Sequence, residues 1–185
     1  MAIEIEKKYR IDPERAVLIE ATLNEFGAEF QGTGFEVNVI YGGGKLDADG
    51  AVLRIRHLAT GSTLTYKRRV GDQSAIKRQT EFETVIGDPA AMTEIAAALG
   101  FVPRVVYEKR RRTWKFGSVE VVIDELPFGW FMEIEGAVTA IGEAEVMLGA
   151  EEIEAVQSTY PALTLAFGTE RNGIFEARFK ASECT

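Results

Sequence analysis

The sequence predicts an α+β fold: an eight-stranded antiparallel β-barrel that forms a tunnel, with a charged interior and helices packed outside. Three observations support this expectation. Most segments alternate apolar and polar residues with the period of a β-strand. Two segments with helical periodicity each follow an Asp-Pro pair. The polar faces of the expected strands carry charges two residues apart, whereas solvated faces usually mix charges with Ser, Thr and Gln.

Eight segments show the strand pattern, and short turns rich in Gly, Asp or Pro separate most of them. They are expected at residues 3–11, 35–41, 51–58, 63–70, 77–86, 105–116, 118–125 and 130–136. Their apolar faces must pack against other groups, and helices can cover part of them. A closed barrel of about eight strands meets both demands, because its interior can hold a small ligand. The competing interpretation is a flat sheet whose charged face is exposed to solvent.

The expected helices follow recognisable start signals. The Asp-Pro pairs at 12–13 and 88–89 place an N-cap residue before a proline in the first turn. Helices are expected at 13–26, 89–99, 142–148 and 151–157. Residues 1–160 are expected to form one domain, and 161–185 a C-terminal tail that stays loose, acts as a lid or packs on the barrel.

Composition limits the classes of function. The 185 residues include 21 Lys and Arg against 29 Asp and Glu, a net charge of −8, which disfavours a surface that coats nucleic acid. The single cysteine excludes a disulfide framework and a Cys-based metal site. No apolar run approaches the length of a membrane span, and no signal peptide can be identified. We therefore expect a cytoplasmic protein, a monomer or homodimer, with no nucleic-acid or membrane partner.

The charges divide into two sets that indicate a chemistry. Carboxylates from several strands, with no His or Cys beside them, suit the hard cations Mg²⁺ or Mn²⁺. This acidic set is Glu4, Glu6, Asp124, Glu133 and Glu135, with Glu81 and Glu83 as possible members. Arginine and lysine side chains beside such a metal site suit the oxygens of a polyphosphate chain. This basic set is Lys8, Arg54, Arg56, Lys67, Arg69, Lys109 and Arg111.

Seven short motifs, in order along roughly residues 1–160, carry a resemblance to a known family. They are Glu4-Ile5-Glu6-Lys7-Lys8, Leu53-Arg54-Ile55-Arg56, Leu64-Thr65-Tyr66-Lys67, Glu81-Phe82-Glu83, Tyr107-Glu108-Lys109-Arg110-Arg111, Asp124-Glu125-Leu126-Pro127-Phe128-Gly129 and Phe131-Met132-Glu133-Ile134-Glu135-Gly136. The set resembles the CYTH superfamily, the triphosphate tunnel metalloenzymes, and is most similar to the branch of class IV adenylyl cyclases and thiamine triphosphatases. Residues 36–42 depart from the Tyr-Phe-Asp segment that members often carry.

The resemblance implies an antiparallel tunnel that binds a triphosphate end-on together with Mg²⁺ or Mn²⁺. It implies Glu4, Glu6, Glu133 and Glu135 as metal ligands with Asp124 in support, and the basic set as triphosphate ligands. Lys8, Arg56 and Glu133 are the candidate catalytic residues. The substrate is expected to be ATP, thiamine triphosphate or inorganic tripolyphosphate.

Three functions fit these expectations. The first is a hydrolase in which water attacks a phosphoryl group of a triphosphate. The second is a class IV adenylyl cyclase, in which the ribose 3′-hydroxyl of ATP attacks the α-phosphorus and releases pyrophosphate. The third is a polyphosphate-binding module without catalysis. Hydrolysis is the preferred expectation, because no residue of the sequence identifies the pocket for base and sugar that a cyclase needs.

Overall fold

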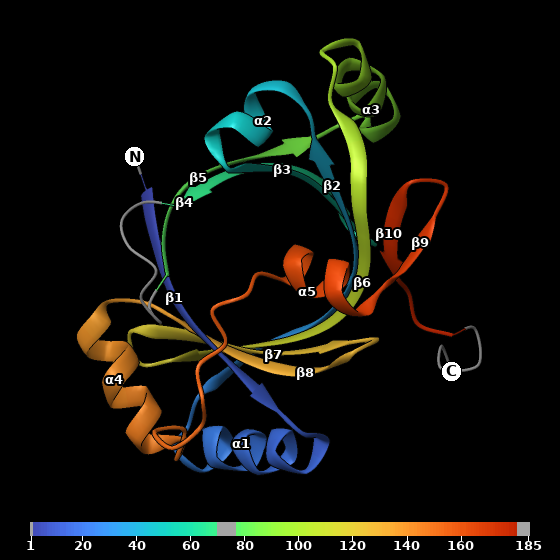
Figure 1. The fold of residues 1–185 in the computed structure, drawn as a ribbon. Helices are drawn as coiled ribbons and strands as arrows, with labels where there is room; N and C mark the ends of the chain where they lie inside the picture. Colours follow the sequence, from blue (N-terminus) through green and yellow to red (C-terminus); the bar gives the residue numbers. More distant parts are fainter. Residues whose placement is uncertain (1, 70–76, 181–185) are drawn as a thin grey trace.

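A closed antiparallel barrel dominates the computed structural model, which describes residues 2–69 and 77–180. Eight strands within these ranges pair in the order β2-β3-β4-β5-β1-β8-β7-β6, and pairing of β2 with β6 closes the ring. Figure 1 shows this ring viewed along its bore, with α1 and α4 against one side and α2 and α3 at the opposite side. The predicted α+β tunnel is therefore confirmed.

The described residues form ten strands and five helices. The strands of the barrel are β1 (Ala2–Ile11), β2 (Glu29–Gly42), β3 (Ala51–Leu58), β4 (Gly61–Arg69), β5 (Lys77–Ile86), β6 (Val102–Phe116), β7 (Val119–Leu126) and β8 (Gly129–Glu135). The helices are α1 (Pro13–Glu25), α2 (Gly44–Asp49), α3 (Pro89–Ala98), α4 (Val138–Met147) and α5 (Tyr160–Phe167). Two short strands, β9 (Thr169–Arg171) and β10 (Ile174–Ala177), follow α5.

The Asp-Pro pairs start helices α1 and α3 as expected. The Asp12 carboxylate accepts a hydrogen bond from the backbone N–H of Arg15 at 2.7 Å. The Asp88 carboxylate accepts from the N–H groups of Ala90 and Ala91, each at 3.0 Å. Both caps satisfy N–H groups that a helix leaves without intrahelical partners.

The outward faces of the strands form the core beneath the helices. Ile123 on β7 and Ile134 on β8 are fully buried in a cluster with Ile19 and Leu23 of α1 and Ile141 of α4. A separate cluster on the opposite side joins β2 and β3 to α2 and α3. Because neighbouring residues of a strand face opposite sides, this packing directs the alternate, charged residues into the barrel.

Several segments differ from the expected secondary structure. Residues 151–157 were expected to be helical, but they run irregularly beside β1, where Val156 N–H donates to the Lys8 carbonyl at 2.7 Å. Helices α2 and α5 lie where no helix was expected, α4 begins at Val138 and not at residue 142, and β2 begins before the predicted residue 35. The predicted strand at 63–70 extends to Val70, which lies outside the described residues.

The C-terminal segment, as far as residue 180, packs on the barrel. Helix α5 contacts β6 and β10, and β10 adds to β6 in parallel, with Phe175 opposite Val105. Residues 181–185 of the expected tail lie outside the described residues. No helix in residues 2–69 and 77–180 has the length and apolar character needed to cross a membrane.

Candidate active site

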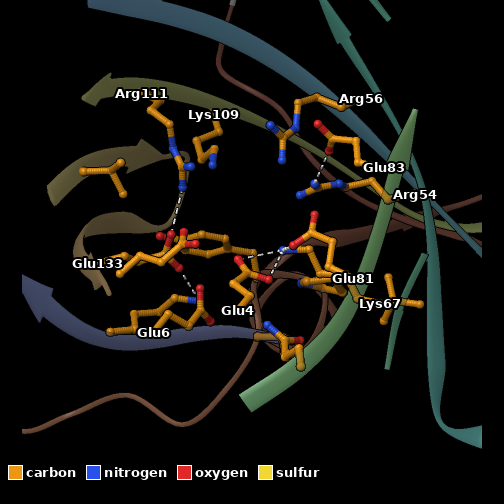
Figure 2. Close-up of a pocket in the computed structure, with 18 of the residues that line it drawn as sticks. Glu4, Glu6, Arg54, Arg56, Lys67, Glu81, Glu83, Lys109, Arg111 and Glu133 are labelled. Carbon is orange, nitrogen blue, oxygen red and sulfur yellow. Dashed lines mark hydrogen bonds and ion pairs between the residues drawn. The ribbon is translucent and has the colours of Figure 1, made fainter. Parts of the chain in front are cut away.

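A cavity of about 320 Å³ occupies the interior of the barrel, and charged side chains form most of its wall. Twelve of the residues that the sequence singled out border it: Glu4, Glu6, Lys8, Arg54, Arg56, Lys67, Glu81, Glu83, Lys109, Arg111, Glu133 and Glu135. Figure 2 shows acids and bases from different strands pointing toward one another across this space. Arg69 and Asp124 do not belong to the wall of this cavity.

One side of the cavity carries a network of buried ion pairs. The Lys8 ammonium lies 3.0 Å from Glu133 Oε1, and Arg111 Nη2 lies 2.8 Å from Glu133 Oε2. Burial alone would lower the pKa of Lys8, but Glu133 and Glu6 outweigh it and raise that pKa. Lys8 therefore stays charged, which suits it to an anionic ligand. The pKa of Lys109, in contrast, is lowered by burial and by the neighbouring Arg111.

Asp124 supports this network, although it does not itself border the cavity. Its carboxylate accepts from Arg111 Nε at 2.7 Å and Nη2 at 2.6 Å, and the Lys109 ammonium lies at 3.3 Å. The Tyr160 hydroxyl donates to Asp124 Oδ2 at 2.8 Å. With its side chain fully buried and both oxygens engaged, Asp124 is placed to orient Arg111 and Lys109.

The other side of the cavity pairs Lys67 with two carboxylates. The Lys67 ammonium lies 2.7 Å from Glu4 Oε2 and 2.9 Å from Glu81 Oε2. Burial would lower the pKa of Lys67, but Glu4 raises it. Arg54 Nη2 of β3 lies 3.7 Å from Glu83 Oε2 of β5, across the intervening strand β4 (Figure 2). The two possible acids, Glu81 and Glu83, are thus both ion-paired to predicted phosphate ligands.

The sequence analysis missed a buried carboxylate, Glu36 on β2. Only 3% of this residue is exposed, and its Oε2 lies 3.4 Å from Lys109 Nζ and 3.6 Å from Arg56 Nε. Asn38 Nδ2 donates to the same oxygen at 3.2 Å. Burial would raise the pKa of Glu36, but Lys109, Arg111 and Arg56 outweigh it and lower that pKa to about 2. The alternation of Glu36, Asn38 and Ile40 was the signal that could have identified it.

Further residues complete the wall. Glu120, Tyr107, Thr159 and Tyr160 all border the cavity. Glu120 shares the inward phase of its strand with Asp124, so the strand pattern already contained that signal. Tyr160 begins α5, a helix that the sequence analysis did not predict.

The acidic residues fit a divalent cation. Glu135 lies opposite both Glu6 and Glu120 on neighbouring strands. Burial, followed by the charges of Glu4 and Glu120, raises the pKa of Glu135 to about 7. The donors of these acids are all oxygens, as Mg²⁺ and Mn²⁺ prefer. Within the described residues no three acids converge on one point, so one or two carboxylates together with phosphate oxygens are the donors that a cation would find here.

Fold and site together define a class of protein: a closed antiparallel barrel whose cavity is lined by opposing acids and bases. The model of the CYTH domain matches residues 2–160, and the chain belongs to that family. No curated protein sequence matches the chain significantly.

Solved structures share this fold. The PH1012 protein of Pyrococcus horikoshii is 25% identical, with a TM-score of 0.72 over 85% of this chain and 96% of its own. A conserved hypothetical protein of Pyrococcus furiosus is 27% identical, with a TM-score of 0.72 over 85% of this chain and 97% of its own. HpAC1 of Hippeastrum is 19% identical, with a TM-score of 0.66 over 89% of this chain and 94% of its own.

Proposed function

We propose that the protein is a Mg²⁺- or Mn²⁺-dependent triphosphatase that cleaves a phosphoanhydride bond of inorganic, thiamine or nucleoside triphosphate. One observation carries the proposal. Among the described residues, six cationic side chains from four strands border a single cavity that also holds a group of carboxylates. Phosphoryl transfer depends mainly on positioning and on neutralising charge, and this cavity supplies groups for both.

The bases provide the recognition of the phosphate chain. Arg54, Arg56 and Arg111 offer planar guanidinium groups that can donate two hydrogen bonds to one phosphate. Lys8 and Lys109 add positive charge in a site with little access to water, where charge interactions are strong. Each of these bases is paired with an acid in the structure, so the acids hold the bases in place and a bound triphosphate would add its oxygens to their hydrogen-bonding partners.

The acids provide the place for the cation. Glu4, Glu6, Glu133 and Glu135 would hold it, and it would supply Lewis-acid activation of water and of a phosphoryl oxygen. In the reaction, water adds to phosphorus, the bond from phosphorus to the bridging oxygen breaks, and the leaving phosphate keeps that oxygen. The proton of the water passes to solvent. Lys8, Arg56 and Arg111 stabilise the negative charge of the transferred group, and Glu133 fixes the position of Lys8.

Hydrolysis is preferred to cyclisation because it needs only water beside the triphosphate site. A cyclase must also hold base and ribose so that the 3′-hydroxyl reaches the α-phosphorus. HpAC1 is described as having a dominant triphosphatase activity. At 19% identity that likeness extends to the fold alone, whereas the contents of the cavity support hydrolysis in this chain.

Phosphorus NMR tests the proposal. Purified protein is incubated with tripolyphosphate, thiamine triphosphate or ATP and with Mg²⁺ or Mn²⁺, with EDTA as the metal-free control. We expect metal-dependent release of orthophosphate or pyrophosphate with no cyclic product, and loss of that signal in Glu133→Gln. Cyclic AMP with pyrophosphate from ATP would establish the cyclase instead. Tight binding of all three compounds with no product would establish a binding module.

A further inference from the structure

Tyr160, the first residue of α5, contacts several groups of the proposed phosphate site at once. It is buried, with 6% of its surface exposed, yet it borders the cavity. The Lys8 ammonium lies 3.6 Å from the centre of its ring, and the Lys109 ammonium lies 5.3 Å from it. Its hydroxyl donates to Asp124, the carboxylate that holds Arg111 through two hydrogen bonds.

From these contacts we infer that Tyr160 is a positioning residue of the triphosphate site, acting on Lys8 through its ring and on Arg111 through Asp124. The inference rests on the proposed function. An ammonium over the face of a buried aromatic ring is attracted by the ring without being neutralised. Lys8 is therefore held between Glu133 and the ring of Tyr160, and it stays available to a phosphate.

The hydroxyl acts on the second group of cations. Asp124 is fully buried, and a buried carboxylate needs its hydrogen-bonding capacity satisfied. The Tyr160 hydroxyl and Lys109 approach the same oxygen, Oδ2, that accepts from Arg111 Nη2. Tyr160 thereby fixes the rotamer of Asp124, and Asp124 fixes the guanidinium plane of Arg111.

The surroundings of Tyr160 hold it rigidly enough for this role. Its ring packs edge-on against Phe131, with ring centres 5.4 Å apart, and tilted against Tyr107 at 6.1 Å. Thr159 caps the helix by accepting from the N–H of Ala162 at 3.3 Å. Helix α5 thus connects the C-terminal segment to groups inside the barrel, and the site depends on more than the barrel strands.

Two variants separate the ring from the hydroxyl. Tyr160→Phe keeps the contact with Lys8 and removes the hydrogen bond to Asp124, so we expect KM for tripolyphosphate to rise about fivefold. Tyr160→Leu removes both contacts, and we expect a rise of about fiftyfold. In both variants kcat should fall as KM rises, because Tyr160 positions Lys8 and Arg111, which the proposed function places against the transferred group, although Tyr160 itself does not touch the reacting atoms.

Tyr41→Phe is the matched control. Tyr41 is also buried, and its hydroxyl lies 3.3 Å from Thr93 Oγ1 in the cluster outside the barrel wall. The Tyr41→Phe variant should lower Tm about as much as Tyr160→Phe does and leave KM for tripolyphosphate unchanged. Steady-state kinetics with Mg²⁺ and thermal unfolding with and without tripolyphosphate are measured on all four proteins.

The wild-type protein separates the two possible failures. If it neither cleaves nor is stabilised by tripolyphosphate, thiamine triphosphate or ATP, the proposed function is wrong and this inference falls with it. If the wild type responds but both Tyr160 variants match Tyr41→Phe in KM, the inference alone is wrong. A raised KM in Tyr160→Leu with a smaller rise in Tyr160→Phe supports it.

Discussion

Replacement of Glu36 by glutamine tests the electrostatics of the barrel interior. The folded environment lowers the pKa of Glu36 from 4.5 to about 2. One pKa unit corresponds to about 1.4 kcal/mol, so the ionised carboxylate contributes about 3 kcal/mol to the free energy of unfolding at pH 7. We expect Glu36→Gln to lower the free energy of unfolding by about that amount, because Lys109 and Arg56 lose a buried counter-charge.

The pH dependence has a definite sign. Because folding lowers the pKa of Glu36, its stabilising effect is complete above pH 4.5 and declines as the pH falls towards 2. The difference between wild type and Glu36→Gln should therefore shrink to about 1 kcal/mol at pH 3. Urea unfolding at pH 7 and pH 3 measures both differences.

A surface pair provides the control for this experiment. Glu125 lies 3.1 Å from Arg110 Nη1 with a quarter of its side chain exposed. Glu125→Gln should cost less than about 1 kcal/mol at pH 7. If Glu36→Gln costs no more than this control at pH 7, or costs more at pH 3 than at pH 7, the electrostatic reasoning is refuted.

Three further variants test other parts of the structure. Glu135→Gln should raise the Mn²⁺ concentration needed for half-maximal activity about tenfold, measured by metal titration; an unchanged titration would exclude Glu135 as a ligand. Leu23→Ala should lower the free energy of unfolding by about 3 kcal/mol in urea, because this residue of α1 is fully buried against the barrel; a loss below about 1 kcal/mol would contradict that packing. Gly168→Ala should lower Tm by several degrees, because a Cβ would lie 2.5 Å from the Thr164 carbonyl oxygen and 2.8 Å from that of Glu176; calorimetry showing no change would refute the close approach.

The barrel could be predicted because each strand carries its own signal. Alternation in β1 places Glu4, Glu6 and Lys8 on one face, and the same rule gives Arg54 and Arg56 on β3. Adjacent strands of a closed barrel share one interior, so the inward-facing residues of these strands can be expected to lie close together from the strand pattern alone. Twelve of the predicted residues reach the cavity wall for this reason.

The remaining features depend on tertiary contacts. Helix α5 spans eight residues, too few for a clear helical period, although Thr159 and Pro161 carried a start signal. The expected helix at 151–157 gave way to pairing of Ala155 with Tyr9 on β1. Asp124 has the inward phase of the ligands, but the match of Arg111 and Tyr160 to its two oxygens appears only in the folded chain.

A crystal structure with tripolyphosphate and Mn²⁺ tests the central claim most directly, because manganese can be located by its anomalous scattering. We expect that crystal structure to show phosphate oxygens within hydrogen-bond distance of Lys8 and Arg111, and an anomalous peak beside Glu4 or Glu133. Binding of tripolyphosphate outside the barrel at saturating concentration, with no phosphate density in the cavity, would contradict the account.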